Sequence, residues 1–220
     1  MKKLMYIMVV FLILLTAGCL EKKDKNIPYV ELIIDGEMGD DGWYVSDVSI
    51  TINAYDNESK IKELKYRING DVWKDYINMP FRLEKDGFYF IEYYAKDENG
   101  NENYKNITVK IDATKPFINF SNFEEGYVYF RGKKLITPRI PRDTMIIGDF
   151  VINVNADDAL SGLKRVEFYM GNTKVYEDTE KPYEWKIESG IGVYNITSVA
   201  YDFAGNYNEI SIEDVQIINL

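Results

Sequence analysis

The chain of 220 residues contains no histidine and a single cysteine. Without histidine it lacks the commonest general base, the Ser-His and Cys-His nucleophile pairs and the usual zinc ligands. One cysteine cannot form a disulfide within the chain. These absences exclude most hydrolase and thiol chemistries and leave only oxygen ligands for any metal ion.

Long apolar runs are also scarce, and the single one lies at the N-terminus. The run from Leu4 to Leu15 follows two lysines and is 12 residues long. A membrane-spanning helix needs about 20 apolar residues, so this run is too short to be one. Residues 1–18 are therefore expected to be a signal peptide. The following Thr16-Ala17-Gly18-Cys19 resembles the lipobox of prokaryotic lipoproteins, in which the cysteine is lipidated and becomes the new N-terminus.

The resemblance implies lipidation at Cys19 and makes residues 19–27 a polar tether. Thr16 stands where a lipobox usually has leucine. An uncleaved anchor and ordinary secretion therefore remain as alternatives.

Positive charge is in short supply, with 26 basic against 36 acidic residues. Loss of residues 1–18 removes two lysines and leaves a net charge of −12. Such a surface repels nucleic acid and anionic head groups. No pair of carboxylates stands out at a glycosidase-like separation. The sequence thus predicts a protein that is not an enzyme and does not bind nucleic acid.

The strongest positive feature is an internal repeat. Residues 52–66 align without a gap on residues 154–168, and Ala95–Asn101 align on Ala200–Asn206. Two copies in the same order predict two similar domains in tandem. Apolar residues alternate with polar ones in short runs separated by turn residues, which is typical of β-sandwiches.

The repeat and the turns place the domain boundaries. We expect domain 1 at residues 28–112, a short stiff linker at 113–116, and domain 2 at 117–220 with an insertion at 126–147. Expected strands of domain 2 span residues 151–154, 163–169, 183–187, 193–201 and 210–217.

Both halves resemble the immunoglobulin-like repeats of bacterial and archaeal surface proteins. The first half does so through Gly42-Trp43-Tyr44 and Asp97-Glu98-Asn99-Gly100-Asn101, the second through Asp158 to Gly162 and Asp202-Phe203-Ala204-Gly205-Asn206. The resemblance implies an all-β fold of two tandem immunoglobulin-like β-sandwich domains. It does not define a function, because such repeats serve as stalks, adhesive modules and accessory domains.

Acidic turns are the candidate metal ligands. Calcium prefers oxygens from carboxylates, amides and carbonyls, and such side chains end the repeated strands: Asp56, Asp97, Asn99, Asn101, Asp157, Asp158, Asp202 and Asn206. Asp and Asn also stabilise turns by bonding their own backbone. Calcium is therefore one expectation and turn formation without a cofactor is the other.

The insertion at 126–147 is the candidate partner-binding surface, because it gathers basic and aromatic residues on an acidic chain: Tyr127, Tyr129, Phe130, Arg131, Lys133 and Lys134.

Trp43, Trp73 and Trp185 could stack on sugar rings, but a tryptophan in a sandwich more often packs in the core. Four sequons offer candidate glycosylation sites: Asn57, Asn106, Asn119 and Asn195.

The leading hypothesis is a non-enzymatic lipoprotein anchored in the membrane and facing outside, acting as an interaction, adhesion or spacer module. Its partners would be the membrane, through the lipid, and a surface protein or glycan. The alternatives are a carbohydrate-binding accessory protein of an exported enzyme and a calcium-stiffened stalk.

Overall fold

A computed structural model describes residues 24–135 and 144–220. The signal peptide, Cys19 and part of the insertion lie outside this range. All regular structure in the described residues is β-strand, so the predicted all-β fold is confirmed. No helix in these two ranges is long and apolar enough to cross a membrane.

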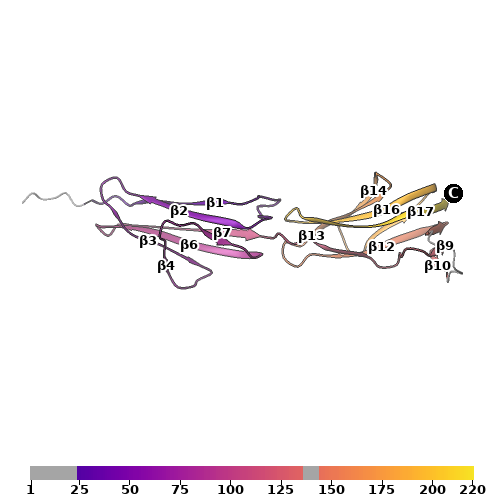
Figure 1. The fold of residues 1–220 in the computed structure, drawn as a ribbon, viewed down its shortest axis with the longest axis horizontal. Coiled ribbons are helices and arrows are strands. Elements are labelled where there is room, and N and C mark those ends of the chain that lie inside the picture. Colours follow the sequence, from indigo (N-terminus) through magenta and orange to yellow (C-terminus); the bar gives the residue numbers. More distant parts are fainter. Residues whose placement is uncertain (1–23, 136–143) are drawn as a thin grey trace, which may run out of the picture. The chain divides into compact units, whose positions relative to one another are not determined.

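The first half contains seven strands in two sheets (Figure 1). One sheet has the order β1-β2-β5 and the other β4-β3-β6-β7. The bounds are β1 Tyr29–Asp35, β2 Val48–Tyr55, β3 Ile61–Ile68, β4 Lys74–Asp75, β5 Phe81–Leu83, β6 Gly87–Asp97 and β7 Glu102–Ile111. Alternation along β2 buries Val48, Ile50 and Ile52 and directs the residues between them outward. This is the hydrophobic pattern of a sandwich strand.

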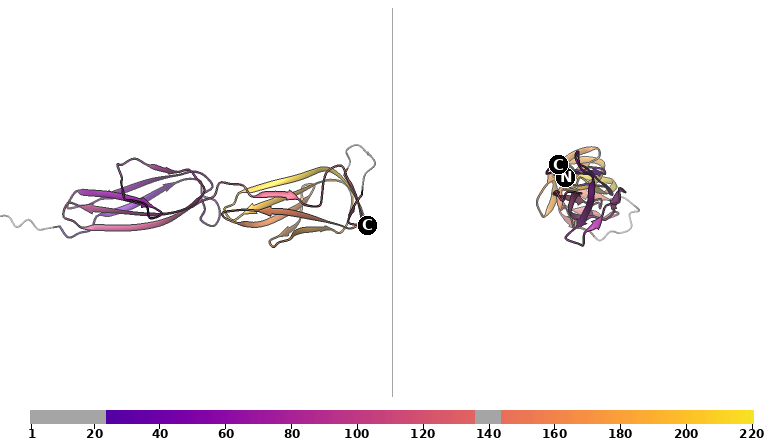
Figure 2. Two further views of the ribbon diagram at one scale, coloured as in Figure 1. Left: turned by 90° about the horizontal axis from the view of Figure 1, so that it is seen from below. Right: turned by 90° about the vertical axis from the view of Figure 1, so that its left-hand side faces the viewer.

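The second half repeats this arrangement. The order β8-β12-β15 corresponds to β1-β2-β5, and β14-β13-β16-β17 corresponds to β4-β3-β6-β7. The bounds are β8 Phe117–Phe120, β12 Phe150–Asp157, β13 Leu163–Met170, β14 Thr173–Asp178, β15 Tyr183–Ile187, β16 Gly190–Asp202 and β17 Tyr207–Asn219. Figure 2 shows the strands of each half from two further directions. The two halves that share the sequence repeat therefore also share the order of their strands.

The predicted insertion extends one sheet of the second half. Its described part forms β9 Val128–Phe130, β10 Lys133–Lys134 and β11 Met145–Ile147. Strand β11 pairs in parallel with β17, β9 pairs in parallel with β11, and β10 closes the edge. The sheet therefore grows to seven strands.

Large apolar side chains from both sheets fill the core of the second half. Phe168 and Val166 on β13 are fully buried, as are Ile152 on β12 and Ile196 on β16. Trp185 on β15 is only 9% exposed, and its ring centroid lies 6.2 Å from that of Phe168. Trp185 and the buried Trp43 therefore contribute mainly to packing.

Candidate functional site

Three aspartates meet at one end of the first half. Asp24 precedes β1, Asp56 follows β2 and Asp97 ends β6, and one carboxylate oxygen from each lies within 4.8 Å of the others. Asp24 and Asp97 are buried, and Asp56 is half-buried. We call this group the first acidic triad. It brings together the predicted residues Asp56 and Asp97 with one that the sequence analysis did not consider.

A second acidic triad occupies the corresponding place in the second half. Asp112 precedes β8, Asp158 follows β12 and Asp202 ends β16, again with one oxygen from each within 4.8 Å of the others. Asp112 and Asp202 are buried. Asp158 and Asp202 were predicted ligands, whereas Asp112 was assigned to the end of domain 1.

A hydrogen-bonded clip holds the lead-in segment of each half beside its triad. The amide nitrogen Nδ2 of Asn101 donates to the Asp24 carbonyl (3.3 Å) and to Asp97 Oδ2 (2.7 Å). In the second half, the Nδ2 of Asn206 likewise donates to the Asp112 carbonyl (2.9 Å) and to Asp202 Oδ2 (2.8 Å). The clip therefore uses the predicted Asn101 and Asn206 as donors to the triads.

A second asparagine extends each clip to a buried proline. Asn103 donates to the Pro28 carbonyl (2.8 Å), and Asn208 donates to the Pro116 carbonyl (3.1 Å). Asp24 and Asp112 each lie four residues before these prolines. This shared Asp-x-x-x-Pro spacing is the sequence signal that would have revealed Asp24 and Asp112.

The hydrogen bonds around the triads set their ionisation. The backbone amides of Glu58 and Ser59 hold the pKa of Asp56 below its ordinary value. Burial is the largest effect on the pKa of Asp97 and raises it, but the hydrogen bonds, chiefly from Asn101, outweigh burial and leave the pKa lowered. Burial raises the pKa of Asp202, and the bonds from Asn206 and Gly205 offset only part of that increase.

Two of the predicted metal ligands, Asp157 and Asn99, lie outside the triads. Asp157 is exposed on β12 and forms an ion pair with Lys181 at 3.0 Å, because alternation along the strand directs it away from its buried neighbour Ala156. Asn99 lies half-buried in the turn between β6 and β7. The structure therefore places neither in the described triads.

The partner-binding surface predicted in the insertion is only partly accessible. Tyr129 is 1% exposed, because alternation along β9 turns it into the core against Phe150; its assignment as a contact residue needs correction. Lys134 pairs with Glu124 at 2.7 Å and lies 3.6 Å from the ring centroid of Tyr127. The exposed members are Phe130, Arg131, Lys133 and Lys134, and Tyr127 is half-buried.

The sequon asparagines differ in accessibility. Asn57, Asn106 and Asn195 are exposed. Asn119 is half-buried on β8, and its Oδ1 is fully buried. Only the first three present the exposure that an attached sugar requires.

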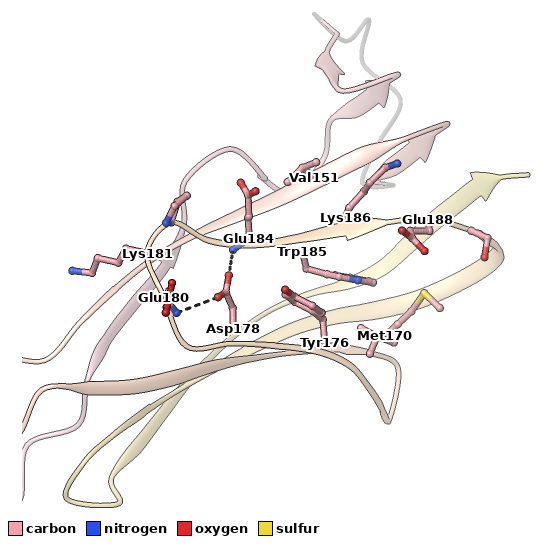
Figure 3. Close-up of a pocket in the computed structure, with 13 residues that line it drawn as sticks. Val151, Met170, Tyr176, Asp178, Glu180, Lys181, Glu184, Trp185, Lys186 and Glu188 are labelled. Atoms are coloured by element: carbon pink, nitrogen blue, oxygen red, sulfur yellow. Dashed lines mark hydrogen bonds between the residues drawn. The ribbon is translucent and has the colours of Figure 1, made fainter.

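An open groove lies between the strands β14 and β15, which end their respective sheets (Figure 3). Its volume is about 840 Å³. Trp185 from β15 and Tyr176 from β14 lie in its middle, and Met170 lies at one end. Asp178 bridges the two strands by accepting the backbone amides of Glu180 (3.2 Å) and Glu184 (3.1 Å). The groove combines an exposed aromatic ring with acidic side chains.

Comparison with known proteins agrees with this architecture. Residues 141–199 match the family model described as a bacterial Ig domain. No curated protein matches the sequence.

Solved structures with similarity to this chain include the following three. Fibronectin(III)-like modules of Clostridium thermocellum CbhA are 15% identical over 86% of this chain and 95% of theirs, with a TM-score of 0.42. Carbohydrate-binding modules from the β-sandwich superfamily are 11% identical over 87% and 86% (TM-score 0.35). A tetra-tandem repeat from the extending region of a large adhesion protein is 14% identical over 84% and 48% (TM-score 0.33). The predicted immunoglobulin-like character is confirmed, and the sequence match to a bacterial Ig domain lies in the second of the two sandwiches.

Proposed function

We propose that this chain is a non-enzymatic surface lipoprotein whose two sandwiches act as a spacer or interaction module outside the membrane. The observation that carries the proposal is the clip that occurs once in each half. Asn101 and Asn206 fasten the lead-in segment of each sandwich to the end of its own β6 or β16 strand. A clip repeated with every module fixes how the chain enters each domain, which a spacer needs.

The chemistry of the ends of the sandwiches supports the same proposal. The convergent acidic groups there are bonded to backbone amides and asparagines of their own turns. A general acid or base must instead reach a substrate. The residues fastened by these bonds are suited to holding the backbone in place.

Replacing Cys19 with serine tests the lipid anchor. A serine cannot be lipidated at this position, so we expect the chain to leave the membrane fraction almost completely. The measurement is fractionation of cells that export the protein, with palmitate labelling of the wild type. Exchange of the nearby Lys22 for serine is the control and should leave the chain in the membrane. Retention of the Cys19→Ser chain at the wild-type level would indicate an uncleaved anchor.

Carbohydrate binding is a second candidate function, favoured by the groove in Figure 3. The Tyr176 side chain is 47% exposed, which leaves a ring face for the C–H face of a sugar. Glu180 and Glu184 line the same groove and can accept hydrogen bonds from hydroxyls.

A panel of soluble oligosaccharides from cellulose, chitin and mannan, titrated while tryptophan fluorescence is followed, tests this candidate. We expect binding to quench Trp185, and Tyr176→Ala to weaken it about tenfold, equivalent to about 1.4 kcal/mol. Tyr55→Ala removes an equally exposed tyrosine, 55% exposed, outside the groove and should have no effect. Equal losses from both variants would contradict a site in the groove.

A further inference from the structure

One oxygen of the first acidic triad lacks a donor. Asp24 is only 6% exposed. Its Oδ1 accepts the backbone amide of Asn26 at 2.8 Å, whereas its Oδ2 is fully buried and has no hydrogen-bond partner among the described residues. A buried, unsatisfied carboxylate oxygen is costly. Such an atom in a native structure requires an explanation, and a bound ion is one.

The equivalent oxygen in the second acidic triad is satisfied. Asp112 Oδ2 accepts the backbone amide of Ser161 at 2.9 Å, and its Oδ1 accepts that of Thr114 at 3.3 Å. In the first half the corresponding amide, that of Ser59, instead donates to Asp56 Oδ1 at 2.8 Å. The two triads share their positions but differ in this donor.

The cause of the difference lies in the next residue of the turn. Gly162 follows Ser161 and has a φ of +87°, in the left-handed region that glycine adopts without strain. Lys60 occupies the aligned position in the first half, where a left-handed conformation would be unfavourable. The first turn therefore closes differently and leaves Asp24 Oδ2 without an amide.

No basic side chain compensates for the charge of the first triad. Within residues 24–135 and 144–220, the ion pairs of the first half involve other carboxylates, such as Glu63, Glu92 and Glu102. Three carboxylates this close, with no cation beside them, repel one another strongly.

We propose that the first acidic triad, Asp24, Asp56 and Asp97, binds one divalent cation, and that the second triad does not bind it at the same concentration. Calcium suits the site because it takes only oxygen ligands and accepts several carboxylates at once. In the second triad the Ser161 amide takes the place that the cation takes in the first. The ion fastens the segment after the tether to the loops of its own sandwich. This inference does not depend on the lipid anchor or on the groove.

Calorimetric titration of the full chain in detergent with calcium chloride tests the proposal. We expect one ion per chain, with magnesium binding at least tenfold more weakly because it requires a stricter geometry. Asp24→Asn should reduce calcium affinity at least tenfold, whereas the matched exchange Asp112→Asn should leave it unchanged. Calcium should also raise the melting temperature of wild type and Asp112→Asn, but not that of Asp24→Asn.

A further variant leaves all three ligands in place. Lys60→Gly allows the first turn to close as the second does and to present the Ser59 amide to Asp24, so calcium affinity should fall several-fold. It also keeps the test decisive if Asp24→Asn does not fold, as judged by circular dichroism. No binding by the wild type, weak binding of many ions to the acidic surface, or equal losses from Asp24→Asn and Asp112→Asn would overturn the proposal.

Discussion

Replacement of Phe168 with alanine is expected to lower the free energy of unfolding of the second sandwich by about 3–5 kcal/mol. Phe168 is fully buried on β13, and the ring centroids of Tyr176 and Trp185 each lie 6.2 Å from its own. Truncation removes apolar area from the core and leaves a cavity that rigid strands cannot fill. Urea unfolding followed by tryptophan fluorescence measures the loss, because Trp185 lies beside the cavity.

The control for this experiment is another phenylalanine of the same sandwich. Phe117 on β8 is 58% exposed, so Phe117→Ala should cost at most about 1 kcal/mol. Similar losses from the two variants would show that the packing around Phe168 is looser than the structure describes.

Asp202→Ala is expected to destabilise the second sandwich by about 2–4 kcal/mol, measured without divalent cations. The carboxylate is fully buried and accepts three hydrogen bonds, from the backbone amides of Gly205 (2.7 Å) and Asn206 (2.8 Å) and from Asn206 Nδ2 (2.8 Å). Alanine leaves buried donors unsatisfied, at about 1–3 kcal/mol each. Alanine also removes the repulsion between the Asp202 carboxylate and those of Asp112 and Asp158, which offsets part of that loss of stability.

Asp202→Asn separates these two effects. Asparagine keeps an acceptor oxygen for the amides of Gly205 and Asn206, whereas it removes the charge and the Oδ2 acceptor of Asn206 Nδ2, so it should cost less than alanine. Thermal melts of the two variants in chelator provide the comparison. If asparagine were as damaging as alanine, the charge and the bond from Asn206 Nδ2, rather than the bonds from the backbone amides, would stabilise the turn.

The fold could be predicted from the sequence because the strand patterns and turn residues that specify it are local and occur in both repeats. Alternation along residues 48–53 marks a strand with one buried face, which forms as expected in β2. Strand β13 also forms where residues 163–169 were expected, although Val166, Glu167 and Phe168 are buried in succession. Strands with few apolar residues were missed. β14, with the sequence TKVYED, lies at a sheet edge, where burial imposes little pattern.

The candidate site was predicted only in part, since its members come from separate segments. The ends of β2 and β6 pointed to Asp56 and Asp97, but Asp24 belonged to a segment interpreted as the end of a tether. The hydrogen bonds from Asn101 to the Asp24 carbonyl and from Asn26 to Glu58 tie this segment to the sandwich. The burial of Tyr129 was equally hidden, because β9 becomes a strand by pairing with β11, which follows it by 15 residues.

The pairing of β17 determines how the second sandwich responds to mechanical load. This strand pairs with β16 from Tyr207 to Asn219 and in parallel with β11 from Gln216 to Ile218. A pull along its axis stretches these hydrogen bonds in shear, so that many must break together rather than one after another, as in unzipping. Forced unfolding is governed by the unfolding rate. Strand β11 of the insertion therefore adds hydrogen bonds that a pull on β17 has to break.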